Sequence, residues 1–177
     1  MTSTIRHLST ALVLVASCPL LVMSAEPTKA APRTIAIDEA RDRARLLHEM
    51  VHATLHYVHH EYYREDEGLT IPAETLKRMF REVAERQKVE LRWLAVQGEA
   101  MNVDHKPRDE FERKAAAAID EGKEEFEQLD QGVYRRAAPV ALTAECIKCH
   151  VPNRKSTEVR FAGLIVRIRN VAPAAAE

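Results

Sequence analysis

The sequence Cys146-Ile147-Lys148-Cys149-His150 has two cysteines separated by two residues, with a histidine directly after the second one. This pattern is the attachment signature of a c-type haem, in which each thiol adds across one vinyl group of the porphyrin. His150 is then the proximal ligand, because its imidazole nitrogen suits iron. A Cys-x-x-Cys pair alone is also typical of zinc sites and thiol redox sites, and the added histidine favours one covalent haem c over both.

The third cysteine of the chain supports this interpretation. Cys18 lies in an apolar run that follows Arg6 and precedes the small residues Ser24 and Ala25. A basic region, an apolar core and small residues in this order predict a signal peptide over residues 1–25 and export to the periplasm. The exported chain then keeps only the two cysteines of the motif, which leaves no partner for a structural disulfide.

Two alternatives would hold the protein at a membrane. The N-terminal run can be retained as a single-span anchor, although it is short and interrupted by Pro19. The residues Val15-Ala16-Ser17-Cys18 are similar to a lipoprotein cleavage site, although Pro19 and further apolar residues follow them. We therefore expect a membrane partner only if this segment is retained or lipidated.

The rest of the chain has the composition of one globular domain, with 46% hydrophobic and 30% charged residues among 177. The formal net charge of -1 gives no reason to expect a nucleic-acid partner. Prolines and small residues predict a flexible linker over residues 26–36. We expect a folded domain over residues 37–170 and a disordered, alanine-rich tail over residues 171–177.

Residues 37–65 contain neither glycine nor proline and predict a long first helix. Apolar residues recur in steps of three and four and form one stripe, made of Ala44, Leu47, Val51, Leu55, Val58 and Tyr62. At about 100° per residue, an arc beside this stripe holds His48, His52 and His59, with His56 close by and His60 at its margin. A haem packed on the stripe would have imidazoles within reach of its iron. The alternatives are partly exposed surface histidines or a weak metal-binding patch.

The sequence after this helix predicts a mixed helix-and-strand domain. In order, it predicts a helix from Pro72, a strand over residues 89–95, a helix from Pro107 to a cap at Gly122, a hairpin around Gly132 and a strand over residues 161–169. Pro139, in the second hairpin strand, implies a sheet edge or a bulge. Met79 is expected to pack in the core, and Met101 and His105 are less favoured iron ligands in a loop.

The position of the motif separates this chain from ordinary small cytochromes c, which are all-helical and carry Cys-x-x-Cys-His near the N-terminus. The chain is instead similar to the PAS-like mono-haem c-type cytochrome family, which includes stand-alone periplasmic haem proteins and periplasmic haem sensor domains. The resemblance covers residues 38–169 and rests on residues 101–112, 132–140, 146–150 and 163–168. It implies an α+β fold, in which a long N-terminal helix packs over a covalently attached haem on a PAS-like antiparallel sheet.

The resemblance also bears on the distal ligand of the iron. In relatives this ligand comes from the first helix and varies in type. Within the histidine arc we expect it to be His52 or His59, which lie beside the apolar stripe in the middle and second half of the helix. The sequence departs from the family at His105, where asparagine is common, and it lacks a Gly-Asp-Pro segment soon after His150.

The sixth iron position decides between two functions. With a distal histidine, we predict a non-enzymatic cytochrome in electron transfer or redox sensing, whose partner is a periplasmic redox protein. With an open or weakly held position, the protein is a gas-sensing or ligand-binding module for a small gaseous ligand. The histidine-rich helix favours the first function. No distal Arg–His pair is evident for a peroxidase. Nothing in the sequence predicts an oligomeric state.

Overall fold

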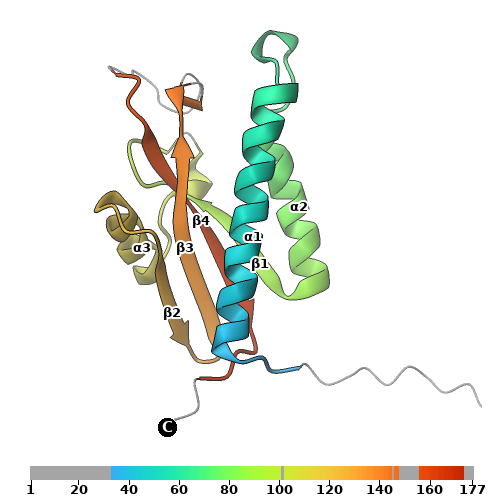
Figure 1. The fold of residues 1–177 in the computed structure, drawn as a ribbon, viewed down its shortest axis with the longest axis vertical. Coiled ribbons are helices and arrows are strands. Elements are labelled where there is room, and N and C mark those ends of the chain that lie inside the picture. The colour runs from blue at the N-terminus through green and yellow to red at the C-terminus, as the bar shows by residue number, and fades with distance from the viewer. Residues whose placement is uncertain (1–32, 101, 145, 148–155, 174–177) are drawn as a thin grey trace, which may run out of the picture. The chain divides into compact units, whose positions relative to one another are not determined.

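A four-stranded antiparallel sheet forms the centre of the fold (Figure 1). The computed structural model describes residues 33–100, 102–144, 146–147 and 156–173, so the predicted signal peptide lies outside the described residues. The strands are β1 (Val89–Leu94), β2 (Phe126–Asp130), β3 (Val133–Leu142) and β4 (Arg160–Arg169), in the sheet order β1-β4-β3-β2. Together with the helices, this sheet confirms the predicted α+β class.

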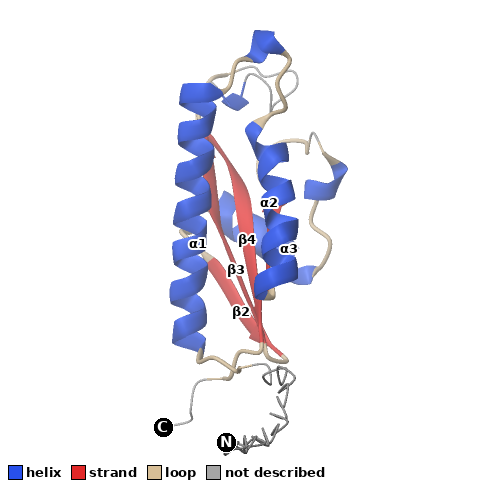
Figure 2. Ribbon diagram, turned by 90° about the vertical axis from the view of Figure 1, so that its right-hand side faces the viewer, coloured by secondary structure: helices blue, strands red, loops and turns tan. Residues whose placement is uncertain are grey.

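Three longer helices cover the two faces of the sheet. α1 (Ile37–Tyr57) and α2 (Pro72–Gln87) pack on one face, and α3 (Glu110–Asp120) packs on the other. α1 runs along the length of the strands (Figure 2). Short turns join these elements: the π-helical η1 (Val58–Tyr62), and the 3-10 turns η2 (Glu65–Glu67) and η3 (Val103–His105). None of the helices in the described residues has the length and apolar character needed to cross a membrane.

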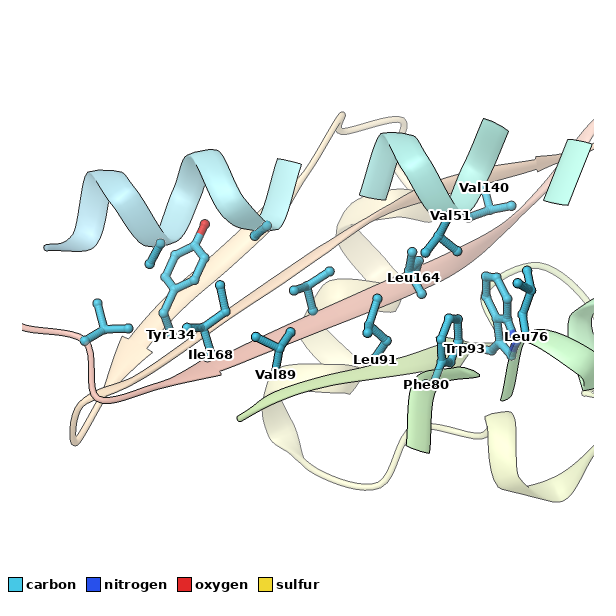
Figure 3. Packing of buried hydrophobic residues seen from close by; sticks show 14 of the residues in the cluster. Val51, Leu76, Phe80, Val89, Leu91, Trp93, Tyr134, Val140, Leu164 and Ile168 are labelled. Carbon is cyan, nitrogen blue, oxygen red and sulfur yellow. The ribbon is translucent and has the colours of Figure 1, made fainter. Parts of the chain in front are cut away.

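The larger core fills the space between α1, α2 and the sheet (Figure 3). Val51, Phe80, Trp93 and Leu164 are each less than a tenth exposed. The rings of Phe80 and Trp93 lie 5.1 Å apart between centroids. Burying each such large side chain stabilises the fold by about 1.5–3 kcal/mol. The prediction that Met79 joins this core was wrong, because its side chain lies on the surface and is 37% exposed.

Ion pairs and a buried tyrosine fix α1 over the β2–β3 hairpin. Tyr134 is fully buried, and its hydroxyl donates to Glu127 Oε2 at 2.6 Å. Glu127 also accepts from Arg41 Nη2 of α1 at 2.7 Å. One turn further along the helix, Arg45 donates to Glu125 at 2.9 Å. Because these carboxylates precede or belong to β2, they join the first half of α1 to the hairpin.

The hairpin confirms its predicted turn and the predicted place of Pro139. Gln131 and Gly132 have positive φ angles of 46° and 74°, which a two-residue hairpin turn of this kind requires. The β2 ladder on β3 stops where Phe126 pairs with Ala137. Beyond Ala137, β3 is therefore a free edge of the described sheet, and Pro139 lies in that edge segment.

Two predicted helix boundaries need correction. The first helix was expected over residues 37–65, but α1 ends at Tyr57, continues as the single wide turn of η1, and gives way to extended backbone at Tyr63. The third helix begins at Glu110 rather than at Pro107. Its start is set by Asp109, whose side chain accepts a hydrogen bond from the Glu112 backbone N–H at 2.9 Å and so caps the helix.

The ends of the folded domain also differ from the prediction. Ile35, from the predicted linker over residues 26–36, pairs in parallel with Val171, from the predicted tail over residues 171–177. These two side chains are 6% and 2% exposed and join the larger core. The folded part therefore extends beyond the predicted limits of residues 37–170 at both ends, because two apolar residues outside them close the base of the core.

Candidate functional site

A cavity of about 220 Å³ lies at the end of the sheet where β1 and β3 end and β4 begins. One wall comes from the second half of α1 and from η1. A second wall comes from the first turn of α2 and from the segment that follows β1. The residues that line it include His52, Leu55, His59, Glu74, Trp93, His105, Val140 and Cys146. Most of the lining surface is apolar.

Four histidines of α1 and η1 line this cavity. His52 and His59, the two predicted distal ligands, are half-buried, whereas His56 and His60 are exposed. Their spacing of three or four residues brings them to one side of the helix. The imidazoles of His56 and His60 stack with centroids 6.2 Å apart and ring planes 1° from parallel. The wide π turn that holds His59 and His60 is a feature that occurs often at functional sites.

His48 belongs to the predicted arc but does not line the cavity. It is 4% exposed, and its ring centroid lies 5.9 Å from that of His52. Burial, with a smaller effect of the Arg136 charge, lowers the pKa of His48 to about 4. A backbone hydrogen bond joins the imidazole to Pro139, which can only accept because proline has no N–H. His48 is therefore a neutral core residue that connects α1 to β3.

We expect the buried state of His48 to make the protein sensitive to mild acid. Unfolding raises the pKa of His48 from about 4 to its ordinary 6.5, so the unfolded chain binds a proton that the folded chain does not. The free energy of unfolding should therefore fall as the pH is lowered from 6.5 towards 4, by on the order of 2 kcal/mol from this group. Urea unfolding at several pH values measures this.

The control for this prediction is the variant His48→Phe, whose phenylalanine side chain cannot take up the proton that His48 binds in the unfolded chain. Other titrating groups are common to both proteins, so the difference between their pH profiles isolates His48. An equal loss of stability in the variant and the wild type between pH 6.5 and pH 4 would contradict the assignment.

Cys146 reaches the cavity from the end of β3. The backbone N–H of Ile147 donates to Thr143 O at 3.0 Å, and the fully buried Ile147 side chain anchors this turn. Cys146 is half-buried, has a free thiol, and lies with its Sγ 3.4 Å from Thr143 Oγ1. Cys149 and His150 lie outside the described residues, so their predicted roles stay predictions.

The segment that carries His105 is fixed by a buried ion pair. Arg92 of β1 forms an ion pair with Glu112 of α3 at 2.7 Å, with side chains 18% and 9% exposed. Arg92 also donates to the backbone carbonyls of Asp104 and Lys106 at 2.5 and 2.6 Å. These two carbonyls flank His105, which the sequence places in an ordinary loop. This role of Arg92 was not predicted from the sequence. The signal for it was a charged residue within the strand β1, whose alternate residues are apolar.

The site combines apolar walls, several imidazoles and one thiol. In the part of the chain that the structure describes, no three side chains of His, Cys, Asp or Glu converge as they would around a bare metal ion. The arrangement instead suits a ligand with a large apolar surface, which one or two imidazoles and a thiol can hold. Of the predicted site residues, the structure brings together Cys146, His52 and His59.

Fold and cavity define an α+β domain in which the second half of a long first helix lines a cavity together with a cysteine from the end of the sheet. The Tll0287-like family model matches residues 32–163, and the chain belongs to this family. The mono-haem cytochrome family predicted from the sequence is thereby confirmed, and its PAS-like character stays a prediction. Among solved structures, the chain is similar to one described as the crystal structure of the cyanobacterial heme-protein Tll0287. The two sequences are 17% identical and the TM-score is 0.47, and the match covers 75% of this chain and 92% of that chain. No curated protein matches.

Proposed function

We propose that this protein is an exported mono-haem c-type cytochrome. Its haem is attached through Cys146 and Cys149, with His150 as proximal ligand and a histidine of the first helix as distal ligand. The observation that carries the proposal is that the first cysteine of the motif and the imidazoles of α1 and η1 line one cavity. Membership of a family named after Tll0287, a cyanobacterial heme-protein, also supports it.

The residues present fit a covalently attached tetrapyrrole. Leu55, Trp93 and Val140 supply apolar surface for the flat faces of the ring. Cys146 supplies a free thiol for a thioether bond, and His52 and His59 supply neutral-nitrogen ligands of the type that iron prefers. When bound, haem supplies an iron that changes between the ferric and ferrous states.

Burial favours His52 and His59 over their neighbours as the distal ligand. Both side chains are half-buried, whereas His56 and His60 are exposed. A ligand shielded from water competes better for the iron than one that is freely solvated. Two imidazole ligands would hold the iron without ligand exchange, which favours electron transfer or redox sensing, with a periplasmic redox protein as partner and no enzymatic turnover. The predicted signal peptide is the basis for the periplasmic location.

Carbon monoxide binding to the reduced protein tests the distal ligand. We expect the wild type to be six-coordinate and low-spin, and one of His52→Ala and His59→Ala to become high-spin. If the open form of the wild type is populated at roughly 1–10%, that variant should bind carbon monoxide about 10- to 100-fold more tightly. Visible absorption spectra during titration measure both effects.

His56→Ala is the matched control, because it removes an imidazole from the same helix at an exposed position. It is expected to keep the low-spin spectrum and the weak carbon monoxide affinity of the wild type. Rapid and tight binding of carbon monoxide by the wild type would exclude the six-coordinate carrier. It would instead assign the protein to the gas-sensing or ligand-binding class with an open sixth position.

A further inference from the structure

His105 lines the cavity, and one of its ring nitrogens is buried with no hydrogen-bond partner among the described residues. Its Nε2 atom is inaccessible to solvent and has no hydrogen-bond partner within residues 33–100, 102–144, 146–147 and 156–173. The residue lines the cavity from the segment after β1, whereas the other lining histidines come from α1 and η1. Buried polar atoms of proteins are nearly always hydrogen-bonded, so an unpartnered one in a residue that lines a cavity points to a contact with the ligand of that cavity.

The backbone holds this imidazole in place without help from a ligand. The carbonyl of His105 accepts from the Ala95 N–H at 2.8 Å, and its own N–H donates to Asn102 O at 2.9 Å. The carbonyls on either side of it accept from Arg92. Position 105 is therefore fixed by main-chain contacts, which a substituted side chain at this position would keep.

His105 is suited to donate a hydrogen bond to an acceptor on the ligand. Burial is the main cause that lowers the pKa of His105; the charges of Lys77 and Arg92 act in the same direction, and those of Asp104 and Glu74 oppose them. His105 is therefore neutral near pH 7 and offers one N–H as a donor. The nearby carboxylate Glu74 forms an ion pair with Lys77 at 3.0 Å. A tetrapyrrole carries its hydrogen-bond acceptors as carboxylates at the edge of the ring, and one of them would accept from this N–H.

We propose that His105 Nε2 donates a hydrogen bond to a carboxylate side chain of the bound tetrapyrrole. This inference rests on the proposed function. The thioether bonds would use the vinyl groups of the ring and so would place Cys146 at its vinyl-bearing side. The two carboxylates would remain free to bind other residues of the cavity wall. In the proposed function a histidine of α1 or η1 is the distal ligand of the iron. His105 is then available to contact the edge of the ring.

The midpoint potential of His105→Phe and His105→Gln tests this assignment. His105→Phe keeps an aromatic ring but lacks the donor, so the carboxylate keeps more of its negative charge, stabilises the ferric iron and lowers the potential. His105→Gln keeps an N–H donor and is expected to stay near the wild-type potential. The visible spectra of all three proteins should remain low-spin. A midpoint potential that rises or does not change in His105→Phe overturns the proposal. A rise would mean that His105 contacts only the ring, because loss of such a polar group disfavours the charged ferric state.

Two further readouts separate this inference from the proposed function. A pyridine haemochrome of the wild type without thioether-linked haem refutes the proposed function and the inference with it. If covalent haem is present, conversion of His105→Phe to a high-spin spectrum overturns the inference alone, since His105 would then be an iron ligand. If His105→Phe does not fold, His105→Leu is used in its place. In the resonance Raman spectra, the bending band of the haem carboxylate is then expected at different positions in His105→Leu and His105→Gln. Identical bands in the two variants overturn the inference.

Discussion

Replacing Cys146 and Cys149 together by alanine is expected to remove all covalently bound haem from the protein. In the proposed function the haem is held through thioether bonds to these two sulfur atoms, and the third cysteine, Cys18, lies in the predicted signal peptide. Haem staining after denaturing electrophoresis should be lost completely, and the pyridine haemochrome should no longer show a thioether-linked product. His150 and the histidines of α1 could still bind free haem, but denaturation would release it.

Single substitutions and a neighbouring residue sharpen this test. Cys146→Ala should leave one thioether and shift the haemochrome band towards that of a vinyl-bearing haem. Thr143→Val is the matched control, because it removes only the hydroxyl that lies 3.4 Å from Cys146 Sγ and should leave covalent attachment intact. Thioether-linked haem in the double alanine variant would refute the attachment site and with it the central claim of the proposed function.

Glu112→Ala is expected to destabilise the fold by about 3–5 kcal/mol. The substitution leaves the Arg92 guanidinium buried without its carboxylate, although burial already lowers the pKa of this group. It also removes the acceptor that holds the backbone N–H of Arg108 at 2.6 Å. A loss of this size is a large part of the about 5–15 kcal/mol that stabilises a typical domain. Urea unfolding of the two proteins measures it.

The control for this prediction lies on the same helix. Glu110 forms an exposed ion pair with Lys114, at 2.9 Å, four residues along α3. Glu110→Ala should leave the free energy of unfolding almost unchanged, because water screens such pairs. Equal effects of Glu110→Ala and Glu112→Ala would show that the Arg92–Glu112 pair contributes no more than a surface contact.

Local sequence patterns were sufficient to predict most of the secondary structure. Alternation of apolar and polar residues is a property of consecutive positions, and it located β1 and β4 to within a residue or two. The turn at Gln131 and Gly132 was equally local, because glycine accepts the positive φ angle. The cysteine motif and the histidine arc could be found in the same way, since helix geometry fixes which residues share a side.

The remaining features depend on contacts between distant parts of the chain. The arc placed His48 and His52 on one side of α1, but only packing against β3 buries the first and leaves the second in the cavity wall. The pairing of Ile35 with Val171 joins residues from the two ends of the domain. The contacts of Arg92 that fix His105 link β1, α3 and the loop between them. No periodicity along the chain encodes such contacts.

The free edge of β3 affects how the protein behaves among other copies of itself. An open strand edge can accept a strand from another molecule and so start aggregation. At Pro139 this edge offers no N–H, and the carbonyl of the same residue already accepts from the imidazole of His48. A strand from a second copy would therefore meet a gap in the hydrogen-bond ladder at this point. The proline, together with a core histidine, protects the molecule against strand-to-strand association next to its cavity.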